Sequence, residues 1–155
     1  MSAASSWRLA TDGAARGNPG PAGAGGMLRD PSGRTVEDFA QYLGTLTNNE
    51  AEYRALLLGL ALARRHQVRE LEIQLDSELV VRQLKREYKV KAAHLKPYHE
   101  RALKELAGFE RWSVRHVRRE ENRDADELAN RGVDAGPASM AGGAASKGGG
   151  RESSR

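Results

Sequence analysis

Four acidic side chains stand where carboxylates can do chemistry. Asp12 and Asp76 each end a short strand-like run, Glu52 lies near the start of a long helical pattern, and Asp126 lies in the first turn of another helical pattern. Four ionised carboxylates cannot share one pocket without positive charge to offset them. The chain has no Cys and no clear His cluster, so its candidate ligands are oxygen atoms, which suit Mg²⁺ or Mn²⁺ better than zinc.

Two such ions about 4 Å apart are the usual arrangement for the attack of water on a phosphodiester. One ion activates the nucleophile and the other stabilises the leaving oxygen. Sequence spacing alone does not prove that the four acids converge. A turn-capping role for Asp12 and a solvated position for Glu52 near a helix start therefore stay open at this point.

The elements that carry these acids predict a mixed sheet with helices packed on it. Hydrophobic periodicity predicts the order β-β-β-α-β-α-α-β-α. The expected elements are strands over 7–11, 22–28 and 34–43, a helix over 49–65, a strand over 71–76, helices from 79 and from 97, a strand over 112–117 and a helix over 124–131. Small and apolar residues share the face of the first helix that carries Glu52, which directs Glu52 toward the strands.

Length and composition predict one globular domain with an anionic partner. The 155 residues are 39% hydrophobic, and the net charge of +4 favours a partner such as nucleic acid. The absence of Cys excludes disulfides and thiolate chemistry. No apolar run approaches the roughly 18 residues of a membrane span, and residues 1–6 lack the features of a signal peptide. We expect a cytoplasmic monomer without a membrane partner.

Two stretches differ from the rest of the chain in composition. Residues 134–155 are rich in Gly, Ala and Ser and cannot bury a core, so we predict a domain over 1–133 and a disordered tail over 134–155. Residues 82–104 carry eight Lys or Arg side chains. This basic run is either a solvated helix surface or a flank that contacts phosphates.

Four dispersed motifs together resemble type 1 ribonuclease H. They are Asp12-Gly13-Ala14 with Gly17-Asn18-Pro19-Gly20-Pro21-Ala22-Gly23, then Thr47-Asn48-Asn49-Glu50-Ala51-Glu52, Leu75-Asp76-Ser77, and Asn122-Arg123-Asp124-Ala125-Asp126-Glu127-Leu128-Ala129-Asn130. The motifs occur in the order of the family and as a set are highly specific. The resemblance implies the α/β ribonuclease H fold, a five-stranded mixed sheet with helices packed on both faces. In that fold strands 1 to 3 are antiparallel, and strands 4 and 5 are parallel to strand 1.

The resemblance also implies a metal-dependent endoribonuclease. Such an enzyme hydrolyses the RNA strand of RNA/DNA hybrids by a two-metal mechanism and leaves 5′-phosphate and 3′-hydroxyl ends. It implies two Mg²⁺ ions per site during catalysis, with Mn²⁺ as a substitute. By motif position, the catalytic and metal-binding carboxylates are Asp12, Glu52, Asp76 and Asp126. The implied contacts with the hybrid are Asn18, Thr47, Asn48, Asn49, Arg118, Arg119 and Asn122.

The chain departs from many members of the family in two places. The loop before the last helix is short, and alternation of the preceding strand favours a position on that strand for His116. Arg118 or Arg119 is then left to act near the scissile phosphate. No basic handle is inserted between the second helix and the last strand, which resembles the handle-less subgroup of archaea and some bacteria.

Alternative functions are a nuclease of the same fold that acts also or mainly on double-stranded RNA, and an exonuclease. A further alternative is a catalytically silent nucleic-acid-binding module. The presence of all four carboxylates favours an enzyme, because a binding module has no need of clustered negative charge. Competition between substrates would separate the two kinds of nuclease.

Overall fold

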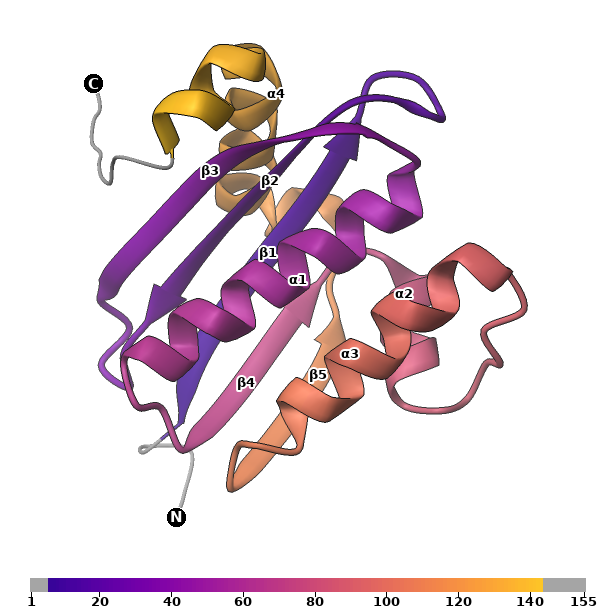
Figure 1. Cartoon of the computed structure of the whole chain (residues 1–155). Coiled ribbons are helices and arrows are strands. Elements are labelled where there is room, and N and C mark those ends of the chain that lie inside the picture. Colours follow the sequence, from indigo (N-terminus) through magenta and orange to yellow (C-terminus); the bar gives the residue numbers. More distant parts are fainter. Residues whose placement is uncertain (1–5, 144–155) are drawn as a thin grey trace.

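The fold is built on a sheet of five strands in the order β3-β2-β1-β4-β5 (Figure 1). The structure, a computed structural model, describes residues 6–143. Its elements are β1 (Trp7–Ala15), β2 (Gly20–Arg29), β3 (Thr35–Leu46), α1 (Asn48–Arg65), β4 (Glu70–Leu75), α2 (Glu78–Leu84), η2 (Ala93–Leu95), α3 (Lys96–Leu106), β5 (Arg111–His116), η3 (Arg119–Glu121) and α4 (Arg123–Gly143).

β1 is the central strand, where the antiparallel and parallel halves of the sheet meet. It pairs antiparallel with β2, which pairs antiparallel with β3. On its other side it pairs parallel with β4, which pairs parallel with β5. The predicted five-stranded mixed sheet is therefore confirmed, including the directions of its strands. Asp12 lies on this central strand, opposite Gly25 of β2.

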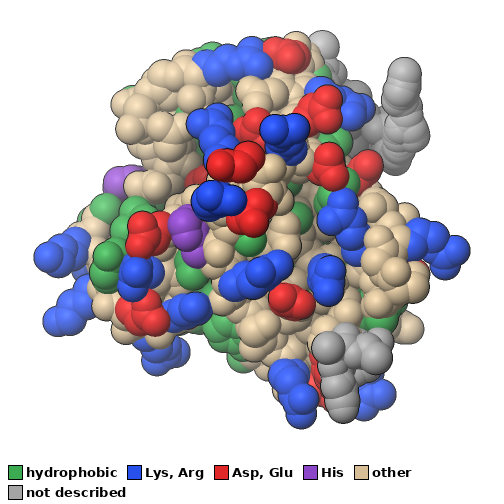
Figure 2. Space-filling view, turned by 180° about the vertical axis from the view of Figure 1, so that it is seen from behind, with side chains coloured by type: hydrophobic (Ala, Val, Ile, Leu, Met, Phe, Trp, Pro, Cys, Tyr) green, Lys and Arg blue, Asp and Glu red, His purple; other side chains and the backbone are tan. Residues whose placement is uncertain are grey.

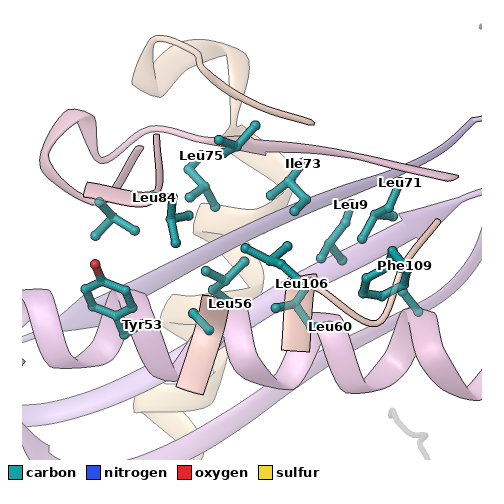
Figure 3. Close-up of a cluster of buried hydrophobic side chains, with 14 of the residues drawn as sticks. Leu9, Tyr53, Leu56, Leu60, Leu71, Ile73, Leu75, Leu84, Leu106 and Phe109 are labelled. Atoms are coloured by element: carbon teal, nitrogen blue, oxygen red, sulfur yellow. The ribbon is translucent and has the colours of Figure 1, made fainter. Parts of the chain in front are cut away.

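Helices cover both faces of the sheet, as predicted. α1, α2 and α3 contribute to the larger core, which they share with β1, β4 and β5; Figure 3 shows part of it, including Leu9, Tyr53, Leu56, Leu60, Ile73, Leu84 and Leu106. α4 packs on the opposite face, across β1, β2 and β3 (Figure 1). A small cluster of Ala10, Met27, Ala125 and Leu128 lies beneath α4.

A capping box fixes the start of α1. Thr47 Oγ1 accepts a hydrogen bond from the Glu50 amide at 3.2 Å, and Glu50 Oε1 accepts one from the Thr47 amide at 2.8 Å. These two bonds satisfy amides that a helix start otherwise leaves unpaired. Thr47 is thus the N-cap, so Glu52 falls in the second turn of α1.

Two glycines allow helices to lie directly against the strands. A Cβ atom added to Gly13 would come within 2.2 Å of the carbonyl carbon and oxygen of Ala51 in α1. A Cβ atom added to Gly25 would come within 2.3 Å of the Ala129 amide nitrogen in α4. Both contacts are with backbone, which cannot rotate away. The absence of side chains here therefore brings α1 and α4 close to Asp12.

α4 is longer than the sequence predicts. The expected helix ends at Arg131 with Gly132 as a stop, but α4 continues to Gly143 and its backbone breaks at Gly136, where φ is 64°. Gly132 instead lies buried against the backbone of Gln41. Residues 134–143 of the expected disordered tail are thus helical on both sides of Gly136, where Gly accommodates the positive φ and the following Pro137 suits the first turn of a new helical segment. The remainder of that tail, residues 144–155, lies outside the described residues.

The connection between α2 and α3 is short. α2 ends at Leu84 and α3 begins at Lys96, with only η2 between them. The predicted absence of an inserted handle is therefore confirmed. Among residues 6–143 no helix combines the length and the apolar character that a membrane crossing requires.

Candidate active site

Three acids from three separate elements meet beside β1, just past the point where its pairing with β4 ends. The prediction that Asp12 ends its strand is wrong, because β1 continues to Ala15. Asp12 of β1, Glu52 of α1 and Asp76, the residue after β4, each place a carboxylate oxygen within 4.8 Å of the other two. Asp12 is only 4% exposed. Glu52 and Asp76 are half-buried. Residues separated by up to 64 positions in the chain are thus brought together by the order of the strands and by α1.

Asp126, in the first turn of α4, lies beside these three acids. Its carboxylate is close enough to Asp12 to raise the pKa of Asp12. Its Oδ1 atom lies 3.7 Å from Nη2 of Arg119. The structure therefore brings all four predicted acids to one place, with Asp126 at the margin of the three-acid cluster.

Burial and mutual repulsion favour the protonated forms of the clustered acids. Burial, followed by the charges of Glu52 and Asp76, raises the pKa of Asp12 to about 10. Burial and the charge of Asp76 raise the pKa of Glu52 to about 8, and burial also raises the pKa of Asp76. A divalent cation among these oxygens would offset the repulsion and displace the protons.

Gly13 holds Glu52 in place through its backbone. The Gly13 amide donates a hydrogen bond to Glu52 Oε1 at 3.1 Å, and this bond opposes the rise in the pKa of Glu52. The expected site residues do not include Gly13. The signal in the sequence was a Gly directly after the acid that ends a strand, which is also what an ordinary turn requires.

Asn122 is a buried residue and differs from the expected contact with the hybrid. Asn122 is only 2% exposed, and its Nδ2 atom donates a hydrogen bond to the Thr11 carbonyl at 3.1 Å. The same amide lowers the pKa of Asp76. Asn122 therefore positions the end of β1 and Asp76 from inside the protein. Within residues 6–137, Asn122 Oδ1 and Thr11 Oγ1 are buried side-chain atoms without a hydrogen-bond partner.

The predicted contacts near the start of α1 lie together. The Asn48 amide donates to Asn18 Oδ1 at 3.0 Å, which ties the loop after β1 to the capped end of α1. Asn18 and Asn48 are exposed, while Thr47 and Asn49 are half-buried. Thr47, Asn48 and Asn49 precede Glu52 by five, four and three residues, or about one turn of α1.

Arg119 is the basic residue whose charge reaches the acids. Besides its ion pair with Asp126, it lowers the pKa of Glu52 and of Asp76. Arg118 lies 4.0 Å from the carboxylates of Glu120 and Glu121 instead. His116 ends β5, as the alternation predicts.

The basic run over 82–104 lies at a different part of the surface. It lines an open pocket of about 490 Å³ between α2 and α3, with Arg86, Lys89 and Lys96 around the exposed ring of Tyr88. Arg82 is paired with Glu78 and Glu87 and lies 5.3 Å from the Tyr88 ring. Seen from behind, the molecule has acidic and basic side chains interspersed near the middle of its surface (Figure 2). Neither the basic pocket between α2 and α3 nor the mixed charges of Figure 2 alone identifies a ligand.

Comparison with known proteins gives one consistent result. A family described as "Reverse transcriptase-like" matches residues 10–132. "Ribonuclease HI" of Halobacterium salinarum is 41% identical over 123 residues, which is 79% of this chain and 62% of that protein. The crystal structure of RNase H1 from the same archaeon has a TM-score of 0.81 at 39% identity, covering 83% of this chain and 98% of that chain.

A second solved structure includes a nucleic acid. LC11-RNase H1, isolated from compost, was crystallised in complex with an RNA/DNA hybrid; it has a TM-score of 0.78 at 38% identity and covers 83% of this chain and 96% of that chain. The chain spans 62% of the halobacterial relative and 37% of "Bifunctional protein Rv2228c" of Mycobacterium tuberculosis. The family match includes every acid of the cluster. Together with "Ribonuclease H" of Aromatoleum aromaticum, 36% identical over 81% of this chain and 88% of that protein, it shows that the chain belongs to the ribonuclease H family.

Proposed function

We propose that this protein is a metal-dependent endoribonuclease that hydrolyses the RNA strand of RNA/DNA hybrids and leaves 5′-phosphate and 3′-hydroxyl ends. The observation that carries the proposal is the convergence of Asp12, Glu52 and Asp76 within 4.8 Å, with Asp126 beside them. A relative with 38% identity, LC11-RNase H1, was crystallised with an RNA/DNA hybrid, which supports the same substrate here.

The donor set fits a hard divalent cation. All the candidate ligands are carboxylate oxygens, and burial with mutual repulsion raises the pKa values of Asp12 and Glu52, a repulsion that a divalent cation would offset. We propose that Asp12, Glu52, Asp76 and Asp126 hold two Mg²⁺ ions during catalysis, with Mn²⁺ as a substitute. Bound there, such ions activate the attacking water and stabilise the leaving oxygen.

The surrounding residues prepare the site. The Gly13 amide orients Glu52, and Asn122 holds Asp76 and the end of β1. Arg119 places positive charge next to Asp126, where the scissile phosphate would bring negative charge. We propose that Glu52 would also accept a hydrogen bond from a 2′-hydroxyl, the group that distinguishes RNA from DNA.

The hybrid would extend from the acids over the start of α1. Asn18, Thr47, Asn48 and Asn49 offer polar groups there for backbone contacts, with Thr47 near a phosphate of the DNA strand. Arg118 and the basic run over 82–104 would add electrostatic attraction to both strands. We place this activity in the domain over residues 1–133 and expect it to act as a cytoplasmic monomer.

A cleavage assay tests the proposal. End-labelled RNA/DNA hybrid, double-stranded RNA and double-stranded DNA are incubated in parallel with Mg²⁺, Mn²⁺ or EDTA. The expected result is metal-dependent cutting of the RNA in the hybrid only, lost in Asp12→Asn. Asp38→Asn is the matched control, because Asp38 is an exposed acid on β3 and its substitution makes the same chemical change away from the cluster.

Two outcomes would contradict the proposal in different ways. Tight binding of the hybrid without cutting by folded protein would indicate a binding module. Faster cutting of double-stranded RNA than of the hybrid would indicate the alternative substrate.

A further inference from the structure

A line of three side chains runs along α4 away from the acids. Asp126, Asn130 and Asp134 are spaced four residues apart, so they lie one above another on one face of the helix. Arg16, the first residue after β1, lies against this face. Neither Asn130 nor Arg16 has a role in the function proposed above.

The Asn130 amide has a defined direction between its neighbours. Its Nδ2 atom donates to the Asp126 carbonyl at 3.0 Å and lies 3.5 Å from Asp126 Oδ1. Its Oδ1 atom accepts from Arg16 Nη2 at 3.3 Å. Because an amide has donors on one end and an acceptor on the other, the Arg16 contact keeps the donor end toward the Asp126 carboxylate.

Arg16 is itself held by α4. Its Nη1 atom pairs with Asp134 Oδ1 at 2.6 Å, and its Nη2 atom also lies 3.5 Å from the Asn130 carbonyl. The guanidinium thus contacts two successive turns of the helix. A planar group with several donors is suited to such a contact, whereas a Lys ammonium has no fork of this kind.

Two groups restrain the same oxygen of Asp126. Asn130 Nδ2 approaches Oδ1 from α4, and Arg119 Nη2 approaches it from η3 at 3.7 Å. Asp126 is the one acid of the four that stands outside the 4.8 Å cluster, and its contacts are a hydrogen bond with the Asp12 side chain and these two neighbours. Arg16 is also two residues from Asn18, which contacts the start of α1.

We propose that Asn130 is a positioning residue for Asp126 and that Arg16 orients Asn130. The loop after β1 then links Asn18 and the start of α1, where we expect the hybrid to bind, to the Asp126 carboxylate. The proposal rests on the function proposed above. Asn130 acts on the carboxylate, and the hybrid contacts neither Asn130 nor the guanidinium of Arg16.

The test compares Asn130→Ala, Arg16→Ala and Arg16→Lys with Arg131→Ala. Arg131 is an exposed residue on the same helix, so its removal controls for the loss of one positive charge. Mn²⁺ binding is measured by calorimetry without nucleic acid, and kcat and KM are measured on the hybrid over a series of Mg²⁺ concentrations. Circular dichroism checks that each variant is folded.

We expect Asn130→Ala and Arg16→Ala to weaken Mn²⁺ binding and to lower kcat by roughly tenfold, the lower end of what outer partners of a metal site contribute. KM for the hybrid stays within about twofold of wild type, Arg131→Ala behaves as wild type, and Arg16→Lys lies between wild type and Arg16→Ala. The double variant is no worse than the poorer single variant, because the two residues act in series.

Two results would overturn the proposal. A rise in KM at unchanged kcat would make Arg16 a direct contact of the hybrid, and unchanged Mn²⁺ binding in both Ala variants would remove the positioning role. If Arg16→Ala does not fold, Asp134→Ala replaces it as the test of the tether, with a smaller loss of Mn²⁺ affinity expected and wild-type affinity contradicting the proposal. If wild type does not cut the hybrid, the proposed function fails, but the calorimetric comparison still decides the role of Asn130.

Discussion

Asp12 carries the largest conflict between folding and chemistry in this protein. It is 4% exposed, faces two other carboxylates within 4.8 Å, and receives no hydrogen bond from a basic side chain among the described residues. Burial of an ionised group without a partner is costly, so the metal-free protein keeps a proton there. A cation bound among these oxygens would offset this cost.

Replacement of this carboxylate should separate stability from activity. In Asp12→Asn, cleavage should fall by more than roughly 100-fold, because a direct metal ligand contributes more than an outer partner does. The metal-free protein should become more stable at pH 8 by at least about 1 kcal/mol, since wild type must take up a proton at Asp12 to fold at that pH, whereas Asn is neutral without one. Chemical denaturation in EDTA checks the second effect, and a less stable variant would contradict the raised pKa of Asp12.

Gly13 should be as sensitive as the acids, but for a steric reason. The methyl group of Gly13→Ala would meet the backbone of Ala51 at 2.2 Å, so α1 must shift and the bond to Glu52 is lost. We expect a loss of about 3 kcal/mol, at the upper end of typical overpacking, together with loss of cleavage. Gly108→Ala is the control, because its methyl group meets the movable end of the Arg64 side chain and comes no nearer than 3.3 Å to backbone, at the Glu105 carbonyl oxygen. Equal melting temperatures for the two variants would refute the steric argument.

At the scale of elements, the start of α1 fixes where Glu52 falls. Thr47→Ala removes the side-chain acceptor of the capping box and should destabilise the protein by about 1 kcal/mol. Thr47→Ser keeps the hydroxyl and should lie within a few tenths of a kcal/mol of wild type. Urea denaturation of the pair measures the difference. If both variants lose the same stability, the methyl group rather than the cap matters at this position.

The strands and helices could be predicted from sequence because their apolar residues repeat regularly. The sheet order and the meeting of the four acids followed from the family resemblance, since spacing alone does not say which strands are neighbours. The length of α4 could not be predicted, because residues 134–143 include Gly136, Pro137 and two further Gly residues, which disfavour a helix interior, and only one large apolar side chain.

Side-chain roles were harder to predict than positions. Asn122 stands in a motif between charged residues, and nothing in the local pattern shows that its side chain is buried beneath Asp76. Arg118 and Arg119 are adjacent and chemically identical, yet only Arg119 reaches the acids. Such differences depend on the path of a short loop in three dimensions.

At the scale of the whole molecule, the acids couple folding to pH and to metal. The pKa values of Asp12 and Glu52 rise from 3.8 and 4.5 to about 10 and about 8, so the folded chain holds more protons than the unfolded chain between those limits. Stability contributed by these groups is therefore highest near pH 4 and falls as the pH rises toward 8.

Thermal melting in EDTA and in Mg²⁺ checks this coupling. In EDTA the melting temperature should fall from pH 5 to pH 8, by about 4 °C for each kcal/mol lost. Saturating Mg²⁺ should reverse most of the fall at pH 8 and have little effect at pH 5, where protons compete with the cation. Asp12→Asn should show a flatter pH profile. A rise in the EDTA melting temperature between pH 5 and pH 8 would contradict the assignment.

The contact between Gly13 and the backbone of α1 has a consequence for screening variants. Two adjacent positions here are restricted for different reasons. Position 12 carries a carboxylate of the acidic cluster, and position 13 must leave room for the backbone of α1 against β1. In a library that randomises both positions, substitutions at either one would give the same loss of activity in a cleavage screen. Only a parallel readout of soluble expression would separate clones that fold without cutting from clones that never fold.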